Sequence, residues 1–213
     1  MKLSTPSASP DFLLQAQSPL RLPSELRLTP EQFSVVCAEN RDAMLELVAD
    51  GHMTAMTPTG SETGSQSAEL LFQLKLFAQG QGQGKWKVFD SSTGFLLPDG
   101  SVLSPDASLV ALERWQALTP DQRRGFAPLC PDLVVELATP SDEGPRGLSA
   151  LRQKMATYQV NGARLGWLLI PHAEAVEVWS ACLEPQYLQQ IDGLEAGPEF
   201  PRLRLQLPAI WAG

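Results

Sequence analysis

Apolar and polar residues alternate along residues 131–138, PDLVVELA, so that acidic side chains fall on an otherwise hydrophobic strand. Successive side chains of a strand point to opposite faces, so the two acids share one face. That face carries Asp132, Val134, Glu136 and Ala138, and the other carries Leu133, Val135 and Leu137. A carboxylate among buried apolar residues is costly unless it is paired or binds a cation. The pattern therefore predicts a partner for Glu136.

Helix and strand signals divide the N-terminal half into short elements. Thr29, Pro30 and Gln32 predict a helix start with a capping box. Residues 45–48 and 52–56 form an expected hairpin around an Asp-Gly turn. After a loop with the sequence PTGSETGS, apolar residues at helical spacing predict a second helix. They are Leu70, Leu71, Leu74, Phe77 and Ala78.

The remaining pattern alternates strands with helices. Strands are expected at residues 86–89, 95–97, 105–112, 165–170 and 176–179. Residues 113–130 form an excursion that is partly helical, and residues 149–161 form a helix. The run at 165–170 is apolar enough to be central in a sheet. This mixed α/β order without an internal repeat predicts one domain, residues 29–213, behind an N-terminal arm of residues 1–28.

Composition limits the class of protein. The chain has 213 residues, a net charge of −8 and 43% hydrophobic residues, which indicates a globular domain. Its three cysteines have no Cys-x-x-Cys spacing and indicate neither a disulfide framework nor a zinc finger, so a reducing compartment is expected. We find no signal-like or membrane-spanning run, which predicts a cytoplasmic protein that has no membrane partner.

The negative charge argues against a protein that coats nucleic acid non-specifically, because such binding relies on lysine and arginine. Six basic residues nevertheless lie within one third of the chain. They are Arg123, Arg124, Arg146, Arg152, Lys154 and Arg164. Either these side chains converge on one surface, or they are scattered solvated charges.

Two carboxylates and a lysine form a set that suits phosphodiester hydrolysis. Asp106 and Glu136 lie on separate expected strands, and Lys154 lies on the helix that follows. Magnesium takes oxygen ligands, usually one or two protein carboxylates beside water and phosphate. Such a cation neutralises the phosphate and acidifies bound water, while Lys154 could orient that water or stabilise developing charge. Glu46, in the first hairpin, is a fourth candidate.

Four segments, in this order, resemble one known family. They read MLELVADGHMTAMTPTGSETG, LPDGSVLSPDASLV, PLCPDLVVELATPSD and LRQKMATYQVNGARLGWLLIP. The chain resembles the Uma-type restriction endonuclease family of the PD-(D/E)XK nuclease superfamily. The resemblance implies a restriction-endonuclease-like fold, with a mixed central β-sheet flanked by helices. It further implies a metal-dependent endonuclease that cleaves nucleic acid, with DNA the expected substrate. Glu46, Asp106 and Glu136 would bind magnesium or manganese, and Lys154 would complete the catalytic set.

The lysine departs from the parent pattern of the superfamily. That pattern expects a lysine two residues after the glutamate, where this chain has Ala138. Members of the Uma-type family are similar in lacking it and carry a lysine on the following helix, which matches Lys154. A long side chain from that helix could reach the strand face. Many relatives also carry a histidine where the second helix begins. This chain has none there, and Gln66 and Ser67 are the polar residues that are candidates for contact with substrate.

Each candidate also has an ordinary structural explanation. Glu46 could pair with Arg41 at the surface, and Lys154 could be a solvated helix residue. Asp106 could be a turn carboxylate, and Asp132 could simply cap a strand rather than bind a ligand.

Three functions stay open from the sequence. Besides the metal-dependent nuclease, the chain could be a catalytically silent relative that binds nucleic acid or a protein partner, which the negative charge and the missing histidine favour. It could also be a metal-free hydrolase of sugars, in which two carboxylates flank the bond. We also expect a homodimer, because the proline-rich arm and an apolar C-terminal segment look suited to covering another surface. That segment contains Phe200, Leu203, Leu205, Leu207 and Trp211.

Overall fold

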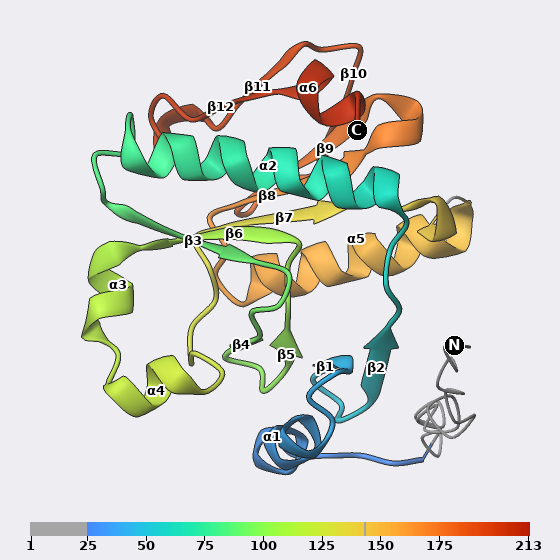
Figure 1. Ribbon diagram of the computed structural model, residues 1–213, viewed down its shortest axis with the longest axis vertical. Helices are drawn as coiled ribbons and strands as arrows, with labels where there is room; N and C mark the ends of the chain where they lie inside the picture. The colour runs from blue at the N-terminus through green and yellow to red at the C-terminus, as the bar shows by residue number, and fades with distance from the viewer. Residues whose placement is uncertain (1–24, 143) are drawn as a thin grey trace, which may run out of the picture.

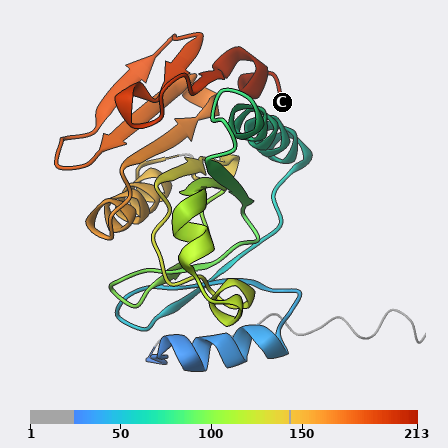
Figure 2. The same cartoon turned by 90° about the vertical axis from the view of Figure 1, so that its left-hand side faces the viewer.

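A six-stranded sheet and a smaller four-stranded sheet form the framework of the protein (Figure 1, and Figure 2 from the side). The computed structural model describes residues 25–142 and 144–213. Most of the arm predicted for residues 1–28 therefore lies outside the described residues. Within the described ranges, no helix is long and apolar enough to cross a membrane. The mixed α/β class predicted from the sequence is confirmed.

The larger sheet has the strand order β10-β9-β8-β7-β6-β3. Its strands are β3 (Trp86–Asp90), β6 (Ala107–Ala111), β7 (Leu133–Leu137), β8 (Leu165–Ile170), β9 (Ala175–Ser180) and β10 (Gln186–Gln189). β7 and β8 pair in parallel and the other neighbours pair antiparallel, so the sheet is mixed. Every residue of β8 is buried, as expected of the apolar run that predicted a central strand.

The smaller sheet has the order β2-β1-β5-β4 and is antiparallel throughout. Its strands are β1 (Met44–Leu47), β2 (Met53–Met56), β4 (Phe95–Leu96) and β5 (Val102–Leu103). The predicted hairpin is confirmed, and Gly51 closes it in a left-handed conformation, with φ of 87°, that glycine adopts freely. Helix α1 (Pro30–Glu39) packs against this sheet and begins with the predicted capping box of Thr29 and Gln32.

Two long helices cover opposite faces of the larger sheet (Figure 1). They are α2 (Ser61–Gln79) and α5 (Pro145–Val160), and α5 forms the long connection that the parallel pair of β7 and β8 requires. Both begin earlier than predicted. The first residues of α2 were expected to be loop, and α5 was expected to start at residue 149. Pro145 explains the second difference, because its fixed φ suits the first position of a helix.

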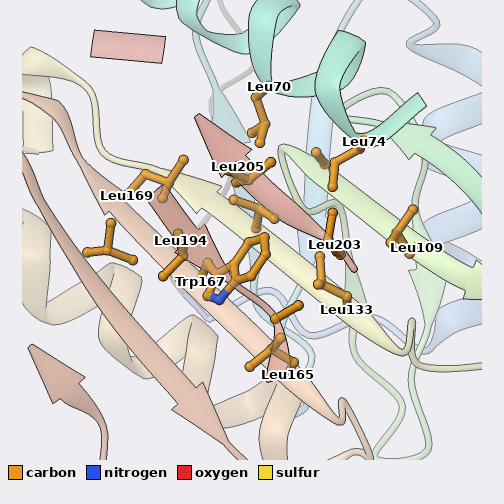
Figure 3. Close-up of a cluster of buried hydrophobic side chains, with 14 of the residues drawn as sticks. Leu70, Leu74, Leu109, Leu133, Leu165, Trp167, Leu169, Leu194, Leu203 and Leu205 are labelled. Carbon is orange, nitrogen blue, oxygen red and sulfur yellow. The ribbon is translucent and has the colours of Figure 1, made fainter. Parts of the chain in front are cut away.

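The alternation along β7 sorts its side chains between two cores. Leu133 and Leu137 belong to the cluster beneath α2, part of which is drawn in Figure 3. Val134 and Ala138 belong to the cluster beneath α5. Glu136, which shares their face, is therefore directed to the α5 side of the sheet, where its charge has to be matched.

The C-terminal segment folds back onto the chain's own sheet, which corrects one expectation. It contains β11 (Gly193–Glu195), the 3₁₀ turn η4 (Gly197–Glu199), β12 (Arg204–Gln206) and α6 (Leu207–Trp211). Its apolar residues lie in the cluster beneath α2, where Figure 3 shows Leu203 and Leu205. Phe200 and Leu207 are buried there too, and Trp211 packs against the cluster. The expectation that this segment covers a partner is wrong, and the homodimer stays a prediction without its support.

The excursion between β6 and β7 is partly helical, as predicted. It contains α3 (Leu112–Ala117) and α4 (Pro120–Arg124), and α4 has a capping box of its own made by Thr119 and Gln122. Two further 3₁₀ turns, η2 (Pro140–Asp142) and η3 (Pro171–Ala173), follow β7 and β8. Trp115 of α3 packs against the core beneath α5, next to Phe89 of β3.

Candidate active site

Lys154 extends from α5 to the sheet face that carries Glu136. Its ammonium Nζ lies 2.8 Å from Glu46 Oε1 and 2.9 Å from Glu136 Oε1. It also donates a 3.0 Å hydrogen bond to the Ser104 carbonyl. The side chain is only 14% exposed. Lys154 is therefore a buried cation between two carboxylates, and not the solvated helix residue that the sequence left open.

Glu46 reaches the site from β1 of the smaller sheet. Its side chain is buried, and Oε1 accepts a 2.7 Å hydrogen bond from the Ser104 amide in addition to its ion pair with Lys154. Arg41, the alternative surface partner, donates to the Ala38 carbonyl instead. Glu46 is thus fixed by a backbone amide and an ammonium group, and the surface pair is not formed.

Asp106 lies just before β6 and contacts β7. Its Oδ2 accepts a 2.7 Å hydrogen bond from the Leu137 amide, which is not the contact of a turn carboxylate. Ala107 faces Val135 in the antiparallel pair of β6 and β7, so the register extended by one residue sets Asp106 opposite Glu136. Opposite residues in such a pair have Cβ atoms roughly 4.5–5.5 Å apart. The two carboxylates therefore belong to the same corner of the sheet.

The site lies where the two sheets meet. In Figure 1 the smaller sheet is below the larger one, and α5 runs along the lower side of the larger sheet. Glu46 comes from the smaller sheet, Asp106 and Glu136 come from the larger one, and Lys154 comes from α5. Its amine therefore links β1 to β7 through ion pairs.

Burial and charge act in opposite directions on the ionisable groups. Burial raises the pKa of Glu136 to about 8, and the neighbouring carboxylates of Asp106 and Glu46 add to that rise, whereas Lys154 opposes it. Burial also raises the pKa of Asp106, against the effect of Lys154. For Lys154, burial alone would lower the pKa, but the three carboxylates more than compensate and leave it above its ordinary value. The corner therefore holds one permanent cation among three acids.

Protein stability without metal is expected to fall as pH rises from about 4.5 toward about 8. The folded pKa of Glu136 is raised from 4.5 to about 8, so the folded state keeps a proton that the unfolded state has released. The slope from this one group is at most about 1.4 kcal/mol per pH unit. The raised pKa of Lys154 changes the stability only at pH values above this range, because lysine stays protonated in both the folded and the unfolded state below it. Urea unfolding in chelator at several pH values measures the slope.

A Glu136→Gln variant is the control for that slope, because glutamine cannot titrate. Its unfolding free energy should change less between pH 5 and 8 than that of the unchanged protein. Equal slopes in the two proteins would contradict the assignment of the raised pKa to Glu136.

The donor atoms of the corner fit a hard cation. Glu46, Asp106 and Glu136 offer carboxylate oxygens, which magnesium and manganese favour. Among the described residues, no three His, Cys, Asp or Glu side chains are arranged closely enough to hold a metal ion by themselves. Magnesium does not require such a cage, because it usually takes one or two protein carboxylates and completes its shell with water and phosphate. Asp106 and Glu136, on facing strand positions, would supply them.

Other residues that the sequence singled out lie outside this corner. Asp132 Oδ1 pairs with Arg114 at 2.8 Å, and its Oδ2 accepts a 2.8 Å hydrogen bond from the Ala111 amide. Asp132 therefore has a structural role, as expected, but it holds the start of α3 against β7 rather than capping a strand. Gln66 is buried in α2, and among the described residues the hydrogen bonds and ion pairs of the corner do not include it.

The basic residues are distributed rather than gathered. Arg124 pairs with Asp121, Arg152 with Glu177, Arg164 with Glu199, and Lys154 with the acidic corner. Four of the six basic side chains thus have carboxylate partners of their own. This favours scattered charges over a single nucleic-acid-binding patch.

The sequence profile of the Uma2 family, described as "Putative restriction endonuclease", matches residues 30–209. The chain belongs to the Uma2 family. A similar solved structure is that of "a putative nuclease belonging to DUF820 from Anabaena variabilis ATCC 29413". It has a TM-score of 0.68 and 15% identity, covering 87% of this chain and 98% of the other. At that identity the likeness shows the fold. Comparison with curated proteins gives no match.

In this Uma2 protein the lysine does come from a helix. Ala138, where the parent pattern has lysine, is a buried residue of the core beneath α5. Lys154 reaches the face of Glu136 from α5, as the helix-lysine hypothesis requires. The sequence missed Ser104, whose amide and carbonyl bind Glu46 and Lys154. Backbone groups leave no signal in residue type, so only its place two residues before Asp106 could have drawn attention to it.

Proposed function

We propose that this Uma2-family protein is a metal-dependent nuclease that hydrolyses phosphodiester bonds of nucleic acid, with DNA as the expected substrate. The observation that carries the proposal is the convergence of Glu46, Asp106, Glu136 and Lys154, from four separate segments, on one buried corner. Buried ionisable groups with strongly shifted pKa values are typical of functional sites. The description of the family supports the nuclease class.

Each residue of the corner has a distinct role in this proposal. Asp106 and Glu136 would hold a magnesium or manganese ion. When bound, such an ion supplies positive charge to the phosphate and lowers the pKa of attached water. Glu46 and Ser104 position the Lys154 amine through their three contacts with one another. The positive charge of Lys154 would stabilise the negative charge that develops during hydrolysis.

Purified protein is expected to cut nucleic acid with magnesium or manganese and to lose this activity in chelator. The test uses supercoiled, linear and single-stranded DNA and RNA in parallel, with products followed on gels. The loss should be complete within detection, because the carboxylates bind and orient but carry no positive charge for the phosphate.

The other outcomes identify the competing functions. Cleavage that persists in chelator would contradict metal dependence. Binding without cleavage of any nucleic acid would favour the catalytically silent relative. Hydrolysis of aryl glycosides in chelator, with nucleic acid left intact, would favour the sugar hydrolase.

A further inference from the structure

Tyr158 is a buried side chain of α5 that the proposed mechanism does not use. It lies four residues after Lys154, which places both on the same face of the helix. The side chain is fully buried, and the Lys154 Nζ lies 6.0 Å from the centroid of its ring. The phenol is therefore packed beside the acidic corner and cannot meet bulk solvent.

The Tyr158 hydroxyl is a donor without a hydrogen-bond partner among the described residues. Glu136 Oε1 is likewise buried, and Lys154, in its 2.9 Å ion pair, is the one neighbour that the described contacts give it. Buried polar atoms nearly always find partners, and an orphan needs an explanation. Here the orphan is a hydroxyl donor, and the Glu136 carboxylate can accept from more than one donor.

The electrostatic environment of Tyr158 also points to Glu136 as its neighbour. Burial raises the pKa of Tyr158 well above its ordinary value, and the carboxylate of Glu136 contributes the largest further rise, ahead of Glu46. The phenol therefore keeps its proton at neutral pH and acts as a donor. Among the charged groups of the corner, Glu136 has the largest electrostatic effect on the pKa of Tyr158.

We propose that Tyr158 is a positioning residue of this site, whose hydroxyl donates to the carboxylate of Glu136 as a second donor beside Lys154. Lys154 Nζ, which lies 2.9 Å from Glu136 and 6.0 Å from the Tyr158 ring centroid, places the two side chains in one buried cluster, where a bridging water would be nearly as favourable as a direct contact. Because the hydroxyl is enclosed, Tyr158 reaches a substrate only through Glu136. It would hold Glu136 in the orientation that binds the cation, and in this respect the inference rests on the proposed function.

A double-mutant cycle without metal tests the contact itself. Tyr158→Phe removes the hydroxyl and keeps the ring, and Glu136→Gln removes the charge of the acceptor. The urea midpoints of the two single variants and the double variant should be non-additive, because groups in contact do not contribute independently. Tyr187→Phe is the matched control, since it removes the only other tyrosine hydroxyl, on the exposed strand β10. Combined with Glu136→Gln, it should be additive.

The affinity for Mn²⁺, measured by electron paramagnetic resonance, tests the positioning role. Loss of a group that orients a metal ligand typically weakens binding about 10- to 100-fold, so Tyr158→Phe should fall in this range and Tyr187→Phe should not differ from the unchanged protein. Additive midpoints in the Tyr158 cycle overturn the proposal. An unchanged Mn²⁺ affinity of Tyr158→Phe overturns it as well. If the unchanged protein binds no Mn²⁺, the proposed function fails, and the metal-free cycle still decides whether Tyr158 contacts Glu136.

Discussion

Replacing Lys154 with methionine is expected to lower the free energy of unfolding by about 3–5 kcal/mol at a pH above about 8, the pKa of the buried Glu136, where both glutamates are ionised. Methionine fills a similar volume but leaves Glu46 and Glu136 buried without their cation. Removal of one partner from a buried ion pair costs more than the pair contributes, because the remaining charge is out of water. The carboxylates can relieve part of this cost by taking up protons, so the loss should shrink as pH falls. Urea unfolding in chelator measures it.

Arg152→Met is the matched control on the same helix. Arg152 also pairs with a buried glutamate, Glu177, but its own side chain is 47% exposed, whereas that of Lys154 is 14% exposed. Because water reaches the half-exposed arginine, loss of this pair should destabilise the protein less than loss of Lys154 does. Equal losses of stability in the two variants would contradict a special role for the Lys154 corner.

A second substitution distinguishes loss of charge from loss of packing. In the Lys154→Met protein, Glu136→Gln should restore part of the lost stability, because it removes one of the two stranded carboxylates. If the double variant is no more stable than Lys154→Met alone, the cost lies in packing around α5 and not in unpaired charge.

Glu136→Gln alone is expected to reduce metal-dependent cleavage by about 10²-fold to 10³-fold or more while the fold is kept, because loss of one preorganised group at a reacting centre has an effect of this size. Glutamine has nearly the same shape, but it cannot supply a negative oxygen to the cation. The measurement is single-turnover cleavage at saturating magnesium, with circular dichroism as the check on folding. Cleavage within about threefold of the unchanged protein would contradict the role of Glu136, by comparison with that expected loss.

Glu177→Gln provides a closely matched control. Glu177 is a buried glutamate of the same sheet that pairs with a basic residue of α5, as Glu136 does. Leu168 of β8 lies between them, opposite Glu136 on one side and Glu177 on the other. The two glutamates thus share one row across the sheet, but only Glu136 belongs to the acidic corner. Cleavage by Glu177→Gln should be nearly unchanged, and a similar loss in both variants would indicate a general effect of charge on the sheet.

Local patterns in the sequence predicted the local structure well. The capping box at Thr29 depends on residues three positions apart, and the faces of β7 depend on a period of two. Both are contained within a few neighbouring residues, and both are confirmed. The apolar C-terminal segment behaved differently. Its residues require burial, but their pattern does not say on which surface, and the expected partner proved to be the protein's own core.

For the candidate site, too, the sequence predicted the residues but not their contacts. The pattern PDLVVELA placed Glu136 on an apolar strand, the chemistry of phosphodiester hydrolysis suggested Asp106, Lys154 and Glu46 as its companions, and the resemblance to a family implied their roles. None of these could show whether the groups touch. In the sequence, Tyr158 is marked only by its position four residues after Lys154. Ordinary core residues on one face of a helix have the same spacing, so it did not indicate a role in the site.

By itself, the sequence determined the helices and strands of this protein and which face of each is buried. It also determined that a buried Glu136 needs a positively charged partner. Tertiary structure decided that the counter-charge is Lys154, that Glu46 shares it and that Ser104 holds both through its backbone. The physical reason is distance along the chain. Contacts of a few ångströms between residues so far apart depend on how β1, β7 and α5 pack against one another, and no local spacing of residue types records that packing.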